Sequence, residues 1–215
     1  MIVIAIDGPA ASGKSSVSRR LAKRLGFAYV NSGSLYRAVT WEALRQGADT
    51  SSQEAIEGAL ANARFACTVT DRGESAVSIN GEIADAALRD IGINSHVSKV
   101  AAVPAVRTLV TNELRALAAG RPLVMEGRDI GSAVFPETPH KFYLDATPEI
   151  RNQRRAAEGL TDQIEARDRM DSTRKTAPLT IAPGARIVDT SYLTLDGVVD
   201  AILDLLKADG IQEKA

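Results

Sequence analysis

Cysteine, net charge and long apolar runs are all scarce in this sequence. A single cysteine, Cys67, rules out an internal disulfide and suits a reducing compartment. The formal net charge at pH 7 is -1, so no global positive field attracts nucleic acid or an acidic membrane. The opening MIVIAI is too short to span a bilayer and lacks the features of a signal peptide. We therefore expect a cytoplasmic protein that binds neither nucleic acid nor membrane.

Internal repeats and low-complexity linkers are also missing. The chain has 215 residues, of which 45% are hydrophobic. That is enough for one sizeable core but short for two full domains. We expect a single domain over residues 1–215 and a monomer.

Five short apolar runs alternate with amphipathic helical patterns. The runs are residues 2–6, 27–30, 123–125, 141–145 and 186–189. Such runs separated by helices predict an α/β fold with a five-stranded parallel sheet and helices on both faces. The last helix carries the clearest apolar stripe, at residues 198–206, and residues 207–215 after it are predicted to be frayed.

A different pattern interrupts this alternation at about residues 64–84. Polar and apolar residues alternate there with period two, and Asn80-Gly81 is a strong hairpin signal. We predict a small antiparallel β insert. Further along the chain, Pro104 is predicted to occupy the first turn of a helix that Gly120 ends.

A phosphate-binding pattern follows the first apolar run. Small side chains let a backbone curl around a phosphate, and the following helix adds the positive end of its dipole. Lysine and serine at the end of the pattern suit the terminal phosphates and Mg²⁺, respectively. A glycine-rich turn with an incidental lysine is the alternative, which the flanking strand and helix patterns disfavour. The expected ATP-binding residues are Gly8, Pro9, Ala10, Ala11, Ser12, Gly13, Lys14, Ser15 and Ser16.

Four further stretches accompany this loop. They are NSGSLYR (31–37), EGRDIGSAVFP (126–136), DATPEIRNQRR (145–155) and RDRMDSTRKTAPL (167–179). In order and spacing, the set resembles the bacterial cytidylate kinase family over nearly the whole chain. The resemblance implies a P-loop nucleoside monophosphate kinase. Such an enzyme transfers the γ-phosphoryl of ATP, with Mg²⁺, to CMP or dCMP in pyrimidine nucleotide metabolism.

The same resemblance implies roles for individual residues. An acceptor-binding region would span about residues 31–104, and a short helical lid about 151–174. The acceptor's phosphate would lie near Ser32, Tyr36, Arg37 and Arg128. The cytosine would be read by Ser98, Arg107 and Asp129, and the sugar held by Arg167 and Asp171. Arg151 would join the ATP site. Catalysis would rest on Lys14, Arg128, Arg154 and Arg174, and Mg²⁺ on Ser15, with Glu126 acting through water.

The chain departs from the family pattern at three places. The segment between Arg155 and Arg167 is shorter than the lid of many members. Met170 stands where some members have arginine. Glu126 stands where many have aspartate, which keeps the carboxylate.

Each of these residues also has a purely structural interpretation. Arg37, near a helix start, opposes the dipole unless an anion lies in front of it. The alternative is a surface ion pair with Glu42 or a neighbour. Tyr36 is equally suited to the core. Arg128 and Asp129 form a site at the end of a strand or, alternatively, an ion pair confined to their own loop.

The arginines of the expected lid have ordinary alternatives as well. Arg167, Asp171 and Arg174 share one helix face, where an Arg–Asp pair is common. Arg151, Arg154 and Arg155 share another, and Glu158 would neutralise them.

Other functions stay open on the residues alone. One is a P-loop kinase for UMP, dTMP or a small-metabolite hydroxyl, with Asp7 or Asp129 as the base. Another is a non-enzymatic nucleotide-binding switch. His96 and His140 show no metal spacing and no nucleophile partner, so neither is assigned a catalytic role.

Overall fold

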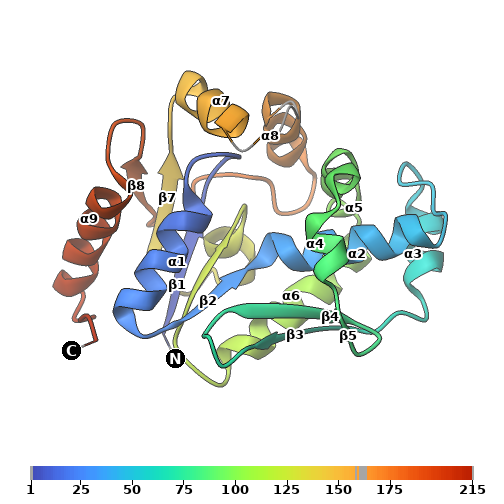
Figure 1. The fold of residues 1–215 in the computed structure, drawn as a ribbon, viewed down its shortest axis with the longest axis horizontal. Coiled ribbons are helices and arrows are strands. Elements are labelled where there is room, and N and C mark those ends of the chain that lie inside the picture. The colour runs from blue at the N-terminus through green and yellow to red at the C-terminus, as the bar shows by residue number, and fades with distance from the viewer. Residues whose placement is uncertain (1, 158, 160–163, 215) are drawn as a thin grey trace.

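A five-stranded parallel sheet runs through the centre of the computed structural model, which describes residues 2–157, 159 and 164–214 (Figure 1). Its strand order is β2-β6-β1-β7-β8, and every neighbouring pair is parallel. The strands are β1 (Val3–Asp7), β2 (Ala28–Asn31), β6 (Leu123–Gly127), β7 (Lys141–Asp145) and β8 (Arg186–Asp189). The predicted sheet is confirmed, with strand bounds displaced by at most two residues.

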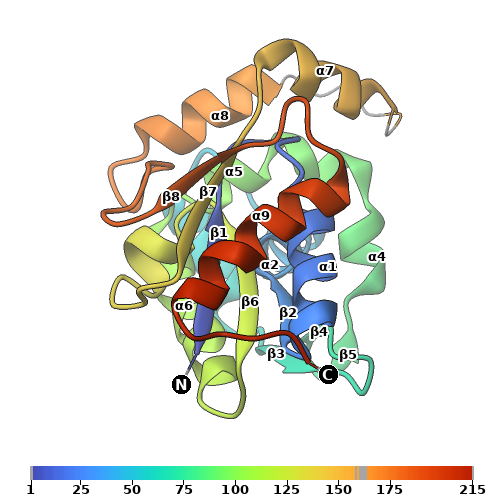
Figure 2. The same ribbon diagram turned by 90° about the vertical axis from the view of Figure 1, so that its left-hand side faces the viewer.

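Helices cover both faces of this sheet. Successive side chains of a strand point to opposite faces, so Ile4 and Ile6 of β1 join one apolar cluster while Val3 and Ala5 join the other. The first cluster is closed by α1 (Lys14–Leu25) and α9 (Leu195–Ala208), which lie side by side (Figure 2). The second is closed by α2 (Ser32–Arg45), α6 (Pro104–Ala118) and a small antiparallel sheet described below. The larger body also includes α3 (Gln53–Leu60).

Short helices connect the larger elements. They are α4 (Asp85–Arg89), the 3₁₀ helix η1 (Ile91–Ser95), α5 (Val97–Val100), the π-helix η2 (Ile130–Val134), α7 (Pro148–Ala157) and α8 (Ile164–Thr173). In both views α7 and α8 lie over the loop that follows β1 (Figures 1 and 2). In the described part of the chain, no helix is both long and apolar enough to cross a membrane.

The predicted β insert is a separate antiparallel sheet. Its strands are β3 (Phe65–Val69), β4 (Ser75–Ile79) and β5 (Glu82–Ile83). Asn80 and Gly81 both have positive φ angles, 54° and 89°, as a tight hairpin turn requires. Cys67 is buried in this sheet. The helix predicted at Pro104 also begins there, as α6.

The predicted fraying of the C-terminus is wrong for the described residues. Lys207 and Ala208 complete α9, and Ile211 is buried against the core beneath it. The backbone N–H of Lys214 donates to the carbonyl oxygen of Arg24 at 3.0 Å, and the Arg24 guanidinium bonds Glu213. An apolar anchor and an ion pair therefore fix the tail to the end of α1.

Candidate active site

The loop between β1 and α1 forms an anion cradle. Gly8 has a φ of 149°, and a Cβ there would lie 2.0 Å from the carbonyl oxygen of Leu144 in β7, so only glycine fits. Gly13 caps α1 with a φ of 88°. The first amides of α1 have no partner within the helix, and its first turn contains no acidic residue. These features favour a bound anion at the start of α1.

Lys14 points back into this loop. Its buried ammonium group donates to the carbonyl oxygen of Pro9 and, at 3.3 Å, to Oγ of Ser12. Burial, followed by the nearby charge of Arg128, lowers the pKa of Lys14 to about 7. Because both acceptors are neutral oxygens, a phosphate would be a better partner for the ammonium.

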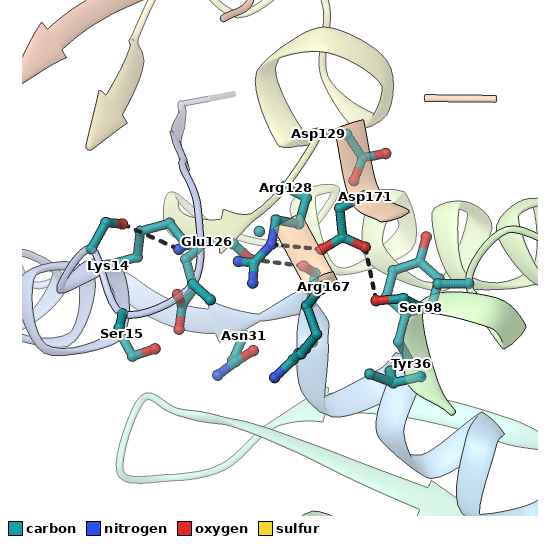
Figure 3. A pocket seen from close by; sticks show the side chains of 18 of the residues that line it. Lys14, Ser15, Asn31, Tyr36, Ser98, Glu126, Arg128, Asp129, Arg167 and Asp171 are labelled. Carbon is teal, nitrogen blue, oxygen red and sulfur yellow. Dashed lines mark hydrogen bonds and ion pairs between the residues drawn. The ribbon is translucent and has the colours of Figure 1, made fainter. Parts of the chain in front are cut away.

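A cavity of about 380 Å³ opens from this cradle (Figure 3). It brings together most of the residues that the sequence assigned to the site. Its lining includes Ala10, Ala11, Ser12, Gly13, Lys14, Ser15, Ser16, Ser32, Tyr36, Arg37, Ser98, Glu126, Arg128, Asp129, Arg167, Asp171 and Arg174. Five of the predicted site residues are not among the described residues that line the cavity but lie around it: Gly8, Pro9, Arg107, Arg151 and Arg154.

Arginines gather where the acceptor's phosphate was expected. Burial lowers the pKa of Arg37, and the nearby charges of Arg167, Arg155 and Arg128 lower it further. The surface pairing of Arg37 with Glu42 is wrong, because Glu42 bonds Arg45 at 2.7 Å instead. Such a gathering of like charges suits an anionic ligand.

Arg155 lines this end of the cavity, although the resemblance assigned it no role. The only sequence signal for it was its place beside Arg154 on one helix face. Glu158, offered as a neutralising partner, and most of the short segment before α8 lie outside the described residues.

Asp171 connects three parts of the site. Its carboxylate accepts from Ser98 Oγ at 2.9 Å and from Arg128 Nε at 3.0 Å (Figure 3), and its carbonyl oxygen accepts from Arg174 Nε at 3.2 Å. Arg128 also donates to the carbonyl oxygen of Gly8 at 3.2 Å. The loop after β6 is therefore joined to both α8 and the cradle. The alternative that Arg128 forms an ion pair only within its own loop is therefore wrong.

A buried ion pair lies at the opposite end of the cavity from the cradle. Arg107 donates to Oδ2 of Asp129 and, at 3.3 Å, to the carbonyl oxygen of Ala101. Burial raises the pKa of Asp129, and the charge of Arg107 opposes that rise. Asp129 lines the cavity and Arg107 lies behind it.

Tyr36 combines the two interpretations that the sequence left open. It belongs to the apolar core, and it also lines the cavity. Its ring lies under the Arg107 guanidinium, 5.6 Å from the ring centroid. Its buried hydroxyl has no hydrogen-bond partner among the described residues, so it is available to a ligand.

Two further buried carboxylates flank the cradle. Asp7 accepts from the backbone N–H groups of Ile130 and Gly131, both at 2.7 Å, and burial raises its pKa to about 6. Both of its oxygens therefore fasten the loop after β6 to β1, which disfavours Asp7 as a base for a hydroxyl acceptor. Glu126 lines the cavity and accepts from the Tyr29 hydroxyl at 2.6 Å.

The oxygens of Ser15 and Glu126 fit a magnesium ion. Both residues line the cavity beside the cradle, and Mg²⁺ prefers oxygen ligands. The described residues contain no group of three or more His, Cys, Asp or Glu side chains placed to hold a metal. An ion here would take its other ligands from phosphates and water.

The predicted lid arginines Arg151 and Arg154 bind the cradle's backbone. Arg151 donates to the carbonyl oxygen of Ala10 at 3.2 Å, and Arg154 to that of Ala11 at 3.5 Å. Arg154 also donates to the carbonyl oxygen of Thr190 at 2.6 Å. These two arginines support the loop from outside the cavity.

Comparisons with known proteins show the family of this chain. The family model described as Cytidylate kinase matches residues 4–208. A cytidylate kinase of Streptomyces griseus subsp. griseus is 40% identical over 96% of this chain and 93% of that protein. A bifunctional pantoate ligase/cytidylate kinase of Synechococcus sp. (strain WH7803) is 42% identical over 95% of this chain, which spans only 44% of that longer relative.

Solved structures add a likeness of fold alone. The crystal structure of an uncharacterized protein from Eubacterium ventriosum ATCC 27560 aligns with a TM-score of 0.50 at 13% identity, covering 97% of this chain and 99% of that one. Membership rests instead on the family model and on relatives that match nearly from end to end. The chain belongs to the cytidylate kinase family.

Proposed function

We propose that this chain transfers the γ-phosphoryl group of ATP to CMP or dCMP, giving CDP or dCDP. One observation carries the proposal: a single cavity contains both the phosphate cradle and a separate cluster of arginines. Two anionic groups can therefore bind face to face. Phosphoryl transfer between two nucleotides needs that arrangement.

The cradle and Lys14 would hold the β- and γ-phosphates of ATP. The acceptor's phosphate would lie against Arg37, Arg128 and Arg155, with one oxygen in line with the γ-phosphorus. No general base is required, because that oxygen is already anionic. Positive side chains would then offset the charge on the transferring group.

Magnesium would be held by Ser15 and, through water, by Glu126. When bound, it would neutralise charge on the β- and γ-phosphate oxygens. Tyr29 would keep the Glu126 carboxylate turned toward that position through its 2.6 Å hydrogen bond.

The buried pair at the far end of the cavity would recognise the base. Asp129 presents a carboxylate acceptor to the cavity, which suits the N4 amino group of cytosine. Arg107 would orient that carboxylate, and Ser98 and Tyr36 would add hydroxyl groups. Asp171 and Arg167 would hold the sugar.

A coupled assay with ATP–Mg²⁺ and each nucleoside monophosphate in turn tests the proposal. We expect turnover with CMP and dCMP well above that with UMP or dTMP. Preferential turnover of UMP, dTMP or a small hydroxyl compound would favour another P-loop kinase. Slow ATP hydrolysis that no monophosphate accelerates would favour a nucleotide-binding switch and refute the proposal.

The proposal also includes a monomeric, cytoplasmic enzyme of pyrimidine nucleotide metabolism, folded as one domain. The cavity that contains both the cradle and the arginines is lined by residues of a single copy of this chain, so the proposed reaction needs no residue from a second copy. Size-exclusion chromatography with light scattering tests the monomer, which a stable dimer at assay concentrations would contradict.

A further inference from the structure

Asp168 of α8 meets the phosphate loop from outside the cavity. Its Oδ1 accepts a hydrogen bond from the backbone N–H of Ala10 at 2.9 Å, and its Oδ2 pairs with Arg151 of α7. Arg151 in turn donates to the carbonyl oxygen of Ala10. Side chains from two helices therefore hold both backbone polar groups of one loop residue.

This contact is largely removed from solvent. The side chains of Arg151 and Asp168 are 11% and 14% exposed, so water and salt screen their attraction weakly. The buried Nε of Arg151 has no hydrogen-bond partner among the described residues. The orientation of that guanidinium therefore depends on Asp168 and on Ala10.

The Asp168 carboxylate does not take the place of a phosphate. The described lining of the cavity includes Ala10 but neither Asp168 nor Arg151. Ala10 also precedes Gly13 and the first turn of α1, where the free helix amides gather. The contact is therefore compatible with a nucleotide on the loop.

Ala10, which this contact holds, directly precedes a residue with a strained backbone. Ala11 has a φ of 57°, which a residue other than glycine adopts only when its surroundings enforce it. Asp168 and Arg151 fix Ala10, its immediate neighbour. Loss of the contact would let Ala11 relax and turn the following amides away from a bound phosphate.

We propose that Asp168 is a positioning residue of the phosphoryl-transfer site, which holds the phosphate loop in its phosphate-binding curl through Ala10 and Arg151. The proposal deepens the proposed function and rests on it, since it takes ATP as the ligand of the loop. It assigns Asp168 no contact with the reacting atoms.

Two substitutions separate the parts of this role. Asp168→Asn keeps an oxygen for the Ala10 N–H but removes the charge that pairs with Arg151, and Asp168→Ala removes both. Glu165→Gln is the matched control, because Glu165 is an exposed carboxylate on the same helix. For each variant, calorimetry gives the affinities for ATP–Mg²⁺ and for CMP, each measured alone, and thermal unfolding gives Tm.

We expect Asp168→Asn to weaken ATP binding about tenfold and Asp168→Ala up to about 100-fold, since charged hydrogen bonds are lost. CMP affinity and the control variant should stay within about twofold of the unmodified protein. The double variant Asp168→Asn/Arg151→Gln should bind ATP no more weakly than Arg151→Gln alone, because Arg151→Gln already removes the pair with Asp168 that Asp168→Asn breaks.

Two results would overturn the proposal. One is unchanged ATP affinity in Asp168→Ala. The other is a parallel loss of ATP and CMP affinity with a lower Tm, because α8 also carries Asp171 and a general disturbance of that helix would reach both ligands. A chain that binds ATP but does not turn over CMP would refute the proposed function alone, since the ATP measurement needs no acceptor.

Discussion

Replacing Asp129 by asparagine should collapse the preference for CMP over UMP. Cytosine offers an N4 amino donor where uracil has an O4 acceptor, and at N3 the roles are reversed, because cytosine accepts there and uracil donates. Each buried group left unpaired costs about 1–3 kcal/mol. The charged Asp129 carboxylate facing O4 of uracil would oppose two acceptors, a mismatch at the upper end of that range, which predicts about 100-fold preference for CMP in the unmodified enzyme at about 1.4 kcal/mol per tenfold.

The contact with Arg107 determines how the new amide would lie. Arg107 offers only donors and already bonds Oδ2 of Asp129, so the asparagine oxygen should face Arg107 and its NH₂ group the cavity. That NH₂ opposes the amino group of cytosine and suits O4 of uracil. We therefore expect the CMP/UMP ratio of kcat/KM to fall about tenfold to 100-fold.

The assay compares kcat/KM for CMP and UMP at saturating ATP–Mg²⁺. Loss of its charged partner leaves Arg107 buried, which costs up to about 3–5 kcal/mol of stability, so thermal unfolding must show that the variant is folded. Asp204→Asn, on the exposed side of α9, is the matched control. Equal kcat/KM for CMP and UMP in the unmodified enzyme would refute the assignment, as would an unchanged ratio in the folded variant.

Further expectations concern the cradle and the α7–α8 region. Lys14→Ala should abolish nearly all transfer while leaving Tm unchanged or higher, because burial already lowers the pKa of Lys14 to about 7; near-normal turnover would contradict this. ATP binding at pH 8, about one unit above that pKa, should take up a proton because phosphate favours the charged lysine. Calorimetric enthalpies should therefore differ between buffers of different ionisation enthalpy, and identical values would count against it. The short segment between Arg155 and Arg167 should exclude water less completely and give more acceptor-free ATP hydrolysis than a long-lid relative, whereas equal rates would show that the length is irrelevant. Burial raises the pKa of Asp7 from 3.8 to about 6. The neutral carboxyl therefore favours the folded state below pH 4, and up to about 3 kcal/mol of that contribution is lost as the pH rises through 6. If the free energy of unfolding depends on pH as strongly in Asp7→Asn as in the unmodified protein, the assignment is contradicted.

Local patterns made much of the sheet and the cradle predictable. Continuous apolar runs are typical of strands buried on both faces, and the phosphate loop requires glycine where Gly8 passes β7. The Asn80-Gly81 turn was equally readable, because positive φ angles restrict the residues that fit.

Contacts between distant residues were not predictable from such patterns. Arg128 and Asp171 are 43 residues apart, and no periodicity links them before the fold brings α8 to the sheet. The contact of Asp168 with Ala10 spans 158 residues and is equally hidden. The C-terminal tail reads as polar and mobile because its anchor, Ile211, is a single apolar residue. The sequence shows Arg155 only as one of three neighbouring arginines and does not indicate which of the three lines the cavity.

The close approach of Gly8 to Leu144 has a consequence for the thermodynamics of nucleotide binding. A loop that rests directly on the backbone of β7 has little conformational freedom left to lose when a phosphate arrives. Most of the ordering cost of this anion site is therefore met when the chain folds, and ATP binding should carry only a small entropy penalty from the loop itself. In that sense the cradle is preorganised by the sheet, and any larger rearrangement on binding must come from elements that the sheet does not fix.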